Sequence, residues 1–156
     1  MKGDSKVIAG LNEVLMAELT AINMYWIHYR MKDDWGYKKL AEHDKSESMD
    51  EMKHADKMIT RIIYLDDKPD MQKYDTVMIG GTVEEQLKNQ YKAECDHVER
   101  LQRVISLCME KRDFGSKEIL EDILEDTEEA CDWLETQFQR IKDVGIENYL
   151  AEHMHD

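Results

Sequence analysis

Residues 48–56 read Ser48-Met49-Asp50-Glu51-Met52-Lys53-His54-Ala55-Asp56, and the rest of the chain is interpreted from this stretch. Glu51 and His54 are three residues apart, so on an α-helix they are neighbours on one face. A carboxylate beside an imidazole suits a first-row transition metal such as iron or zinc. Met52 is turned about 100° around the helix axis and faces a different surface. We expect the Glu51 and His54 face to look into a bundle core and the Met52 face to look out at a partner.

The composition favours one helical domain. The chain has 156 residues, of which 36% are charged and 42% apolar, with a single proline and two phenylalanines. This length fits a single domain over residues 1–156, and a composition rich in Glu, Lys, Leu, Ile and Met favours helices over sheet. Lys and Arg number 21 against 35 Asp and Glu, which gives a net charge of -14. We therefore expect no binding to nucleic acid and none to an anionic membrane.

The cysteines and the N-terminus indicate a cytoplasmic protein. Cys95, Cys108 and Cys131 are an odd number without a Cys-x-x-Cys spacing, which argues against a disulfide scaffold or a zinc ribbon. Each falls in an expected helix, where a buried thiol behaves as a small apolar group. No signal-peptide core follows residues 1–6, and no apolar run approaches the roughly 20 residues that a membrane span needs.

Apolar periodicity predicts four long helices of roughly 25 to 30 residues and a short one at the end. Residues 66–81 have little periodicity and form a connector long enough to cross from one end of a bundle to the other. Thr82 and Glu85 form a capping box, and Gly145 is a typical C-terminal stop. In chain order the long helices run from Ser5 to the break at Gly36, from about Tyr37 to Leu65, from the cap at Thr82 to the break at residues 113–116, and from there to Gly145.

Charged side chains stand on the stripes that should face the core. Glu18 fills a gap in the apolar stripe of the first helix, and Glu94 does so in the third. The second helix has an inward series of four polar residues, Asp44, Glu47, Glu51 and His54. Three carboxylates in one apolar core would desolvate and repel one another, whereas a bound cation would supply the missing positive charge. We predict a metal site at Glu18, Glu51, His54 and Glu94; for Glu18 and Glu94 the alternatives are a buried salt bridge or a stripe tilted toward solvent.

Motifs in several parts of the chain occur in an order that resembles one known family. They are Met1-Lys2-Gly3-Asp4 with Val7-Ile8, Glu18-Leu19-Thr20-Ala21-Ile22-Asn23, Asp34-Trp35-Gly36, Asp50-Glu51-Met52-Lys53-His54-Ala55-Asp56, and Asp132-Trp133-Leu134-Glu135 with Asn148-Tyr149-Leu150. The sequence resembles a bacterioferritin, of the ferritin superfamily. This resemblance implies an all-α, ferritin-like four-helix bundle with a long crossover between helices two and three and a short C-terminal fifth helix.

The resemblance also implies iron storage and assigns roles to residues. It implies a hollow multi-subunit cage that takes up Fe(II), oxidises it with dioxygen and stores a ferric mineral. By the family pattern, Glu18 and Glu94 are single carboxylate ligands of iron, and Glu51 with His54 is the first Glu-x-x-His of a di-iron ferroxidase centre. Met52 matches the methionine that binds haem b, paired with its mate across a two-fold subunit interface; the alternative is one more core methionine among eleven.

The second Glu-x-x-His of the family pattern is missing. The matching positions in the fourth helix hold Thr127 and Ala130. Fast two-electron chemistry with dioxygen needs two irons held close together, with carboxylates bridging them. The pocket of Glu18, Glu51 and His54 keeps three ligands for one metal, so we expect weak or slow oxidation by this chain alone.

Three accounts of the function therefore stay open, as does the question whether this chain is an enzyme by itself. The first is a haem-binding subunit with impaired ferroxidase activity, in a homo-oligomer or mixed with a second, ferroxidase-competent bacterioferritin subunit. The second is a self-sufficient ferroxidase in which His97, or Glu128 turned inward by a π-bulge, replaces the missing ligands. A surface position is the favoured interpretation of His97. The third is a four-helix interaction protein without metal.

Overall fold

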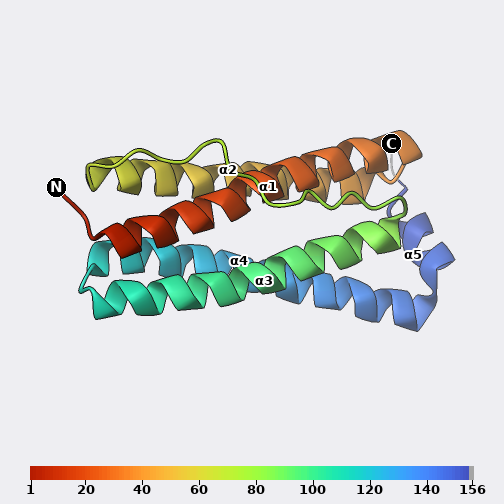
Figure 1. The fold of residues 1–156 in the computed structure, drawn as a ribbon. Coiled ribbons are helices and arrows are strands. Elements are labelled where there is room, and N and C mark those ends of the chain that lie inside the picture. The colour runs from red at the N-terminus through yellow and green to blue at the C-terminus, as the bar shows by residue number, and fades with distance from the viewer. Residues whose placement is uncertain (155–156) are drawn as a thin grey trace.

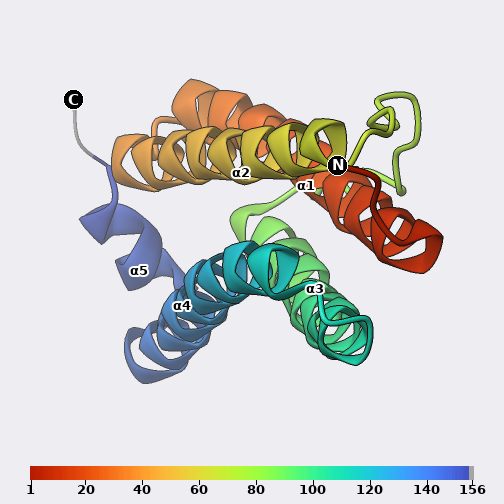
Figure 2. The same cartoon turned by 90° about the vertical axis from the view of Figure 1, so that its left-hand side faces the viewer.

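The computed structural model describes residues 1–154, which form five helices (Figure 1). In chain order these are α1 (Ser5–Trp35), α2 (Lys38–Tyr64), α3 (Val83–Glu110), α4 (Phe114–Val144) and α5 (Ile146–Glu152). Figure 2 shows α1 with α2 in one layer and α3 with α4 in the other, with α5 at one end of the bundle. The predicted all-α, ferritin-like four-helix bundle with a short C-terminal helix is confirmed.

The segment between α2 and α3 is the predicted long crossover. It leaves the end of α2 and returns along the bundle to the opposite end, where α3 begins (Figure 1). Three side chains along α1 accept hydrogen bonds from backbone N–H groups of the crossover. These bonds join Asp70 to Asn12 at 2.8 Å, Asp75 to Thr20 at 2.8 Å, and Gly80 to His28 at 3.2 Å. The crossover is therefore fastened to α1 over much of that helix.

The helix ends follow the predicted caps with small differences. The Asp4 carboxylate accepts from two N–H groups at the start of α1, and the Thr82 hydroxyl accepts from the Glu85 N–H at 3.2 Å. The Glu85 carboxylate reaches back to the N–H of Gly81 at 2.8 Å, one residue before the N–H that a regular capping box uses. Helix α4 begins inside the break expected at residues 113–116.

The core has two apolar clusters with a polar layer between them. One cluster lies at the N-terminal end of α1 and includes Leu11, Leu15, Met58, Ile62 and Leu101. The other lies toward α5 and contains Leu40, Val83, Leu87, Leu134 and Tyr149. The buried charged and polar side chains of the inward stripes fall between these clusters. The apolar ends stabilise the bundle, and the polar layer is the place to look for function.

Helix α1 does not fit one expectation from the sequence. By length and composition alone it is apolar enough to cross a membrane, so the expectation that no apolar run approaches that length was wrong for this helix. In the structure 56% of the apolar window is buried, and α1 packs against α2 and α3. Its apolar character is accounted for by its position in the bundle core.

Candidate metal centre

Glu18, Glu51 and His54 meet inside the bundle. Glu18 comes from α1, and the other two come from α2, where the three-residue spacing puts them on one face. One ligand atom from each lies within 4.8 Å of the other two. His54 Nδ1 is 3.6 Å from Glu18 Oε2 and 3.5 Å from Glu51 Oε2. All three residues are buried, so three of the four predicted ligands share one small space in the bundle interior.

Four polar atoms in this region have no hydrogen-bond partner among residues 1–154. They are Glu18 Oε2, Glu51 Oε2, His54 Nδ1 and Glu94 Oε2. Buried polar atoms are nearly always hydrogen-bonded, since leaving one unpaired costs about 1–3 kcal/mol. A divalent cation between these atoms would satisfy them together. One imidazole nitrogen with carboxylate oxygens is a donor set that iron and zinc both accept, so the residues present fit a metal ion.

Asp126 of α4 holds the His54 ring in place. His54 Nε2 lies 2.8 Å from Asp126 Oδ2, so Nδ1 faces the two glutamates. A carboxylate behind a histidine in this way orients metal-binding imidazoles. Burial lowers the pKa of His54, but the nearby carboxylates of Glu18 and Asp126 outweigh it and raise the pKa to about 9. The sequence analysis missed Asp126, because its side chain is 55% exposed and lies off the inward stripe of α4.

Glu94 lies beside the three-residue cluster. It is buried, and its Oε1 accepts a hydrogen bond from the hydroxyl of Tyr25 at 3.2 Å. Burial, followed by the negative charges of Glu47 and Glu18, raises the pKa of Glu94 to about 8. Without a cation this carboxyl group therefore holds a proton at neutral pH. Its role as a fourth ligand stays a prediction.

His97 is buried against the centre and is not the surface residue that the sequence favoured. Its Nε2 lies 2.6 Å from Glu18 Oε1, and its Nδ1 lies 3.1 Å from a guanidinium nitrogen of Arg100. Burial raises the pKa of Glu18, but the hydrogen bond from His97 and the nearby imidazoles of His97 and His54 outweigh it and lower the pKa. Glu18 is therefore ready to bind a cation as a carboxylate.

Helix α4 supplies no ligand at positions 127 and 130, where the sequence departs from the family pattern. The Thr127 hydroxyl donates to the carbonyl of Ile123, one turn earlier in its own helix, at 2.8 Å. Ala130 lines an open hollow of about 500 Å³ that also has Glu51 and His54 on its wall. Helix α4 is α-helical throughout and Glu128 is exposed. The prediction that a π-bulge turns Glu128 inward to replace a missing ligand is therefore wrong.

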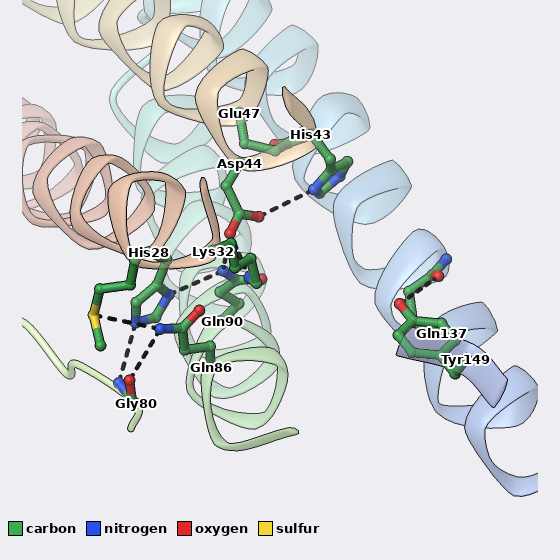
Figure 3. A network of polar contacts seen from close by, with 11 residues as sticks. His28, Lys32, His43, Asp44, Glu47, Gly80, Gln86, Gln90, Gln137 and Tyr149 are labelled. Carbon is green, nitrogen blue, oxygen red and sulfur yellow. Dashed lines mark hydrogen bonds and ion pairs between the residues drawn. The ribbon is translucent and has the colours of Figure 1, made fainter. Parts of the chain in front are cut away.

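The polar layer continues past the metal centre as a hydrogen-bonded network (Figure 3). Lys32 and Asp44 form an ion pair in which both side chains are almost wholly buried. Gln90 Nε2 lies 3.3 Å from Asp44 Oδ2 and 3.0 Å from His28 Nδ1. Asp44, part of the inward polar series of α2, is thus satisfied by a buried salt bridge and by Gln90. The sequence analysis did not pair it with Lys32.

Met52 points away from the core. Its side chain is 52% exposed, and Met49 and Ile63 on the same outward stripe of α2 are 47% and 58% exposed. Exposed apolar side chains grouped in this way typically mark a surface that a partner covers. The interpretation of Met52 as one more core methionine is therefore wrong.

The chain is similar over nearly its whole length to known proteins of one family. A family model described as a ferritin-like domain matches residues 8–144. The chain is 43% identical over 152 residues to a bacterioferritin of Mycobacterium tuberculosis, covering 97% of this chain and 96% of that protein. A bacterioferritin of Mycolicibacterium paratuberculosis is 42% identical over the same length and coverage. One of Brucella melitensis is 41% identical over 149 residues, covering 96% of this chain and 92% of that protein.

Proposed function

This chain belongs to the bacterioferritins, within the ferritin-like proteins, and its family indicates iron storage. We propose that it is a haem-binding subunit with impaired ferroxidase activity. It acts in the cytoplasm as part of a ferritin-type cage. A second bacterioferritin subunit with complete ferroxidase ligands supplies the oxidation, and this chain contributes shell, haem and a one-metal pocket.

The observation that carries the metal site is the convergence of unpaired ligand atoms. Glu18 Oε2, Glu51 Oε2 and His54 Nδ1 come from two helices and find no hydrogen-bond partner within residues 1–154. Folding buries these groups without satisfying them, which is unfavourable unless something binds between them. A cation at this point supplies the missing partner, and Glu94 is the fourth candidate ligand.

The impaired oxidation follows from the fourth helix. Transfer of two electrons to dioxygen requires two irons bridged by carboxylates. The Thr127 hydroxyl is tied to its own helix and Ala130 has no ligand atom. The second iron would therefore have only Glu94 and a share of Glu51.

The first experiment measures Fe(II) oxidation by cages of this chain alone, from the absorbance of the ferric product. We expect slow oxidation, and a Thr127→Glu, Ala130→His double variant should raise the initial rate by about tenfold or more. A wild-type cage that already oxidises iron as fast as the double variant would contradict the proposal.

The haem proposal rests on Met52 and its surroundings. A thioether is a plausible axial ligand of haem iron, and a pair of them favours the reduced iron. A two-fold axis beside this exposed apolar face would bury it and place two Met52 side chains on opposite sides of one haem. Such a haem would help electrons reach the stored mineral for iron release.

The haem experiment uses a matched pair of methionines. Met52 and Met109 are both 52% exposed, on α2 and α3 respectively. After reconstitution with haem, Met52→Leu should lose the Soret band of the bound haem, and Met109→Leu should keep it. Equal haem content in the two variants would exclude Met52 as the ligand.

The partner proposal has its own test. Purification of the assembly from its native host should give two subunit types on a denaturing gel. An assembly of this chain alone with rapid iron uptake would end the proposal of a partner.

The second candidate function is a self-sufficient ferroxidase, and the observation in its favour is the buried position of His97, 2.6 Å from Glu18. In that case the lone cage oxidises Fe(II) quickly and Glu94→Ala abolishes the activity. The third candidate, an interaction protein without metal, predicts no bound iron, no Soret band and a small assembly in size-exclusion chromatography.

A further inference from the structure

His97 and Arg100 form a chain of hydrogen bonds that ends on Glu18, and we propose that His97 is a positioning residue for Glu18 and not a metal ligand. Arg100 orients the ring of His97, and the ring holds one oxygen of Glu18 so that the other is presented to a single bound metal. This inference rests on the proposed metal site at Glu18, Glu51 and His54.

The hydrogen bond from Arg100 decides which nitrogen of His97 carries the proton. An arginine guanidinium has only N–H donors, so His97 Nδ1, 3.1 Å away, must accept. A neutral imidazole that accepts at Nδ1 carries its proton on Nε2. That N–H lies 2.6 Å from Glu18 Oε1 and donates to it. Both nitrogens of the ring are thus engaged in hydrogen bonds.

A metal-ligand role for His97 conflicts with this arrangement. To bind a metal through Nε2, the ring would need its proton on Nδ1. Two N–H donors, one from His97 and one from Arg100, would then face each other across 3.1 Å. The hydrogen bond to Glu18 would be lost as well. The ring is therefore in the tautomer that supports a carboxylate, and it adds no ligand for a second metal.

Arg100 is positioned mainly by packing. Its side chain is only 15% exposed, and its Nε lies 3.9 Å from Glu13 Oε1 on α1, an ion-pair distance at which no hydrogen bond forms. His97 and Arg100 are three residues apart, so they lie on the same face of α3. The sequence of α3 therefore sets both members of the chain of hydrogen bonds on the side of Glu18.

The consequence for Glu18 is a fixed mode of binding. Its Oε1 is taken by His97, whereas its Oε2 is free and lies 3.6 Å from His54 Nδ1. Glu18 then binds a metal through one oxygen, without bridging to a second ion.

The test uses Co(II) as the probe, because its visible absorption reports on its ligands. Wild-type cages should bind one Co(II) per subunit at this site. In His97→Leu the hydrogen bond to Glu18 is lost, and the affinity should fall about 10- to 100-fold, as when other residues that orient metal ligands are removed. In His97→Gln the side-chain amide can still donate to Glu18 Oε1, so most of the affinity should return. The stoichiometry should stay at one in each protein.

Arginine variants provide a second arm with a matched control. Arg100→Leu frees His97 Nδ1 and should weaken Co(II) binding, whereas Arg140→Leu should not, because Arg140 is exposed and lies on α4, not on α3 beside His97. Circular dichroism and the thermal midpoint check that each variant is folded, and binding is compared among folded proteins only.

The outcomes separate the inference from the function it rests on. Wild-type protein that binds no Co(II) would overturn the metal site and this inference together. Wild-type protein that binds Co(II) with the same affinity as His97→Leu would overturn the inference alone. His97 would be shown to be a ligand if His97→Gln bound less than one Co(II) per subunit, or if the absorption of its bound Co(II) differed from wild type as much as that of His97→Leu.

Discussion

Three of the four candidate ligands use one polar atom in a hydrogen bond and leave another atom without one. The bonded pairs are His54 with Asp126, Glu18 with His97, and Glu94 with Tyr25. The remaining atoms, His54 Nδ1, Glu18 Oε2 and Glu94 Oε2, have no partner within the described part of the chain. His54 Nδ1 lies at ion-pair distance from Glu18 Oε2 and Glu51 Oε2, 3.6 and 3.5 Å, but makes a hydrogen bond with neither. No lysine or arginine pairs with the free oxygens within the described residues, so a bound cation could take the place of the imidazole proton between them.

Removal of the carboxylate behind His54 tests this arrangement. Asp126→Ala leaves His54 Nε2 without its acceptor, so the ring is free to turn, and Zn(II) affinity should fall about 10- to 100-fold. Asp122→Ala is the matched control, one turn earlier on α4 and also exposed. Competition with a chelating dye gives both affinities. Equal affinities in the two variants would show that Asp126 does not orient the ligand.

The candidate ligands could be predicted from the sequence, but the residues that contact and orient them could not. Glu18, Glu51, His54 and Glu94 stand out because each interrupts an apolar stripe of helical period, and a stripe can be read without a structure. Asp126 could not be found in this way, because it is exposed on α4. The position of His97 depends on how α3 is rotated against α1, which periodicity does not fix.

At the scale of the helices, the bundle holds a buried charge pair between α1 and α2. Lys32 is wholly buried and Asp44 is 1% exposed. Removing one partner of such a pair leaves an isolated buried charge, whereas replacing both with apolar residues is often neutral. The pair therefore specifies how the two helices meet without being the main source of stability.

Replacement of Lys32 measures this effect. Lys32→Met should lower the free energy of unfolding by about 3–5 kcal/mol, because it leaves Asp44 buried without its cation. The double variant Lys32→Met, Asp44→Leu should recover most of that loss. Lys92→Met removes an exposed pair with Asp96 and should hardly change the unfolding midpoint. Guanidinium unfolding compares the four proteins, and a double variant as unstable as the single one would contradict the argument.

The crossover has a hydrogen bond that acid should break. His28 accepts from the N–H of Gly80, and burial, with the charge of Lys32, lowers the pKa of His28 to about 4. The unfolded chain takes up this proton near pH 6.5, so between about pH 6.5 and 4 it binds more protons than the folded chain. Stability should therefore fall as the pH falls through that window, by up to about 1.4 kcal/mol per pH unit.

Thermal midpoints measured from pH 7 to pH 4 test this dependence. His28→Gln has no titrating group but keeps an acceptor for Gly80, so its midpoint should fall less steeply with acid than that of the wild type. Parallel curves for the two proteins would show that His28 is not the group responsible.

Much of the element-scale structure could be predicted, because helix periodicity and caps are local signals. The four long helices and the crossover lie close to the predicted bounds. The path of the crossover could not be predicted, since it depends on single hydrogen bonds to Asn12, Thr20 and His28. The length of the apolar stretch in α1 was underestimated from the sequence, because Glu18 and other polar residues interrupt it.

At the scale of the whole molecule, two hollows flank the metal centre. One, of about 150 Å³, lies under the crossover and has Ala93, Glu94 and His97 on its wall. The other, of about 500 Å³, lies between α2 and α4 and has Glu51, His54 and Ala130 on its wall. The first has one candidate ligand, Glu94, on its wall. The second brings two proposed ligands to an open surface, because position 130 has only a methyl group.

The charges of the two hollows also differ. The smaller one has three carboxyl groups against two cations: Asp75, Glu94 and Asp96, with Lys92 and Arg100. The larger one has five carboxylates against two lysines: Glu47, Asp50, Glu51, Asp126 and Glu129, with Lys53 and Lys57. A surface with an excess of negative charge concentrates cations, so we expect metal ions to reach and leave the centre between α2 and α4.

Matched substitutions at two alanines test this route. Ala130→Leu narrows the larger hollow and should slow Co(II) association about tenfold, a barrier raised by about 1.4 kcal/mol. Ala93→Leu adds the same side chain to the smaller hollow and should leave the rate unchanged. Stopped-flow absorbance gives the rates, and the equilibrium affinities should stay similar, because neither alanine is a ligand. Slow Co(II) association in Ala93→Leu, with an unchanged rate in Ala130→Leu, would place the route under the crossover. With the expected result, Ala130, which stands where the family pattern has its second histidine, would also be the residue that opens the remaining metal site to solvent.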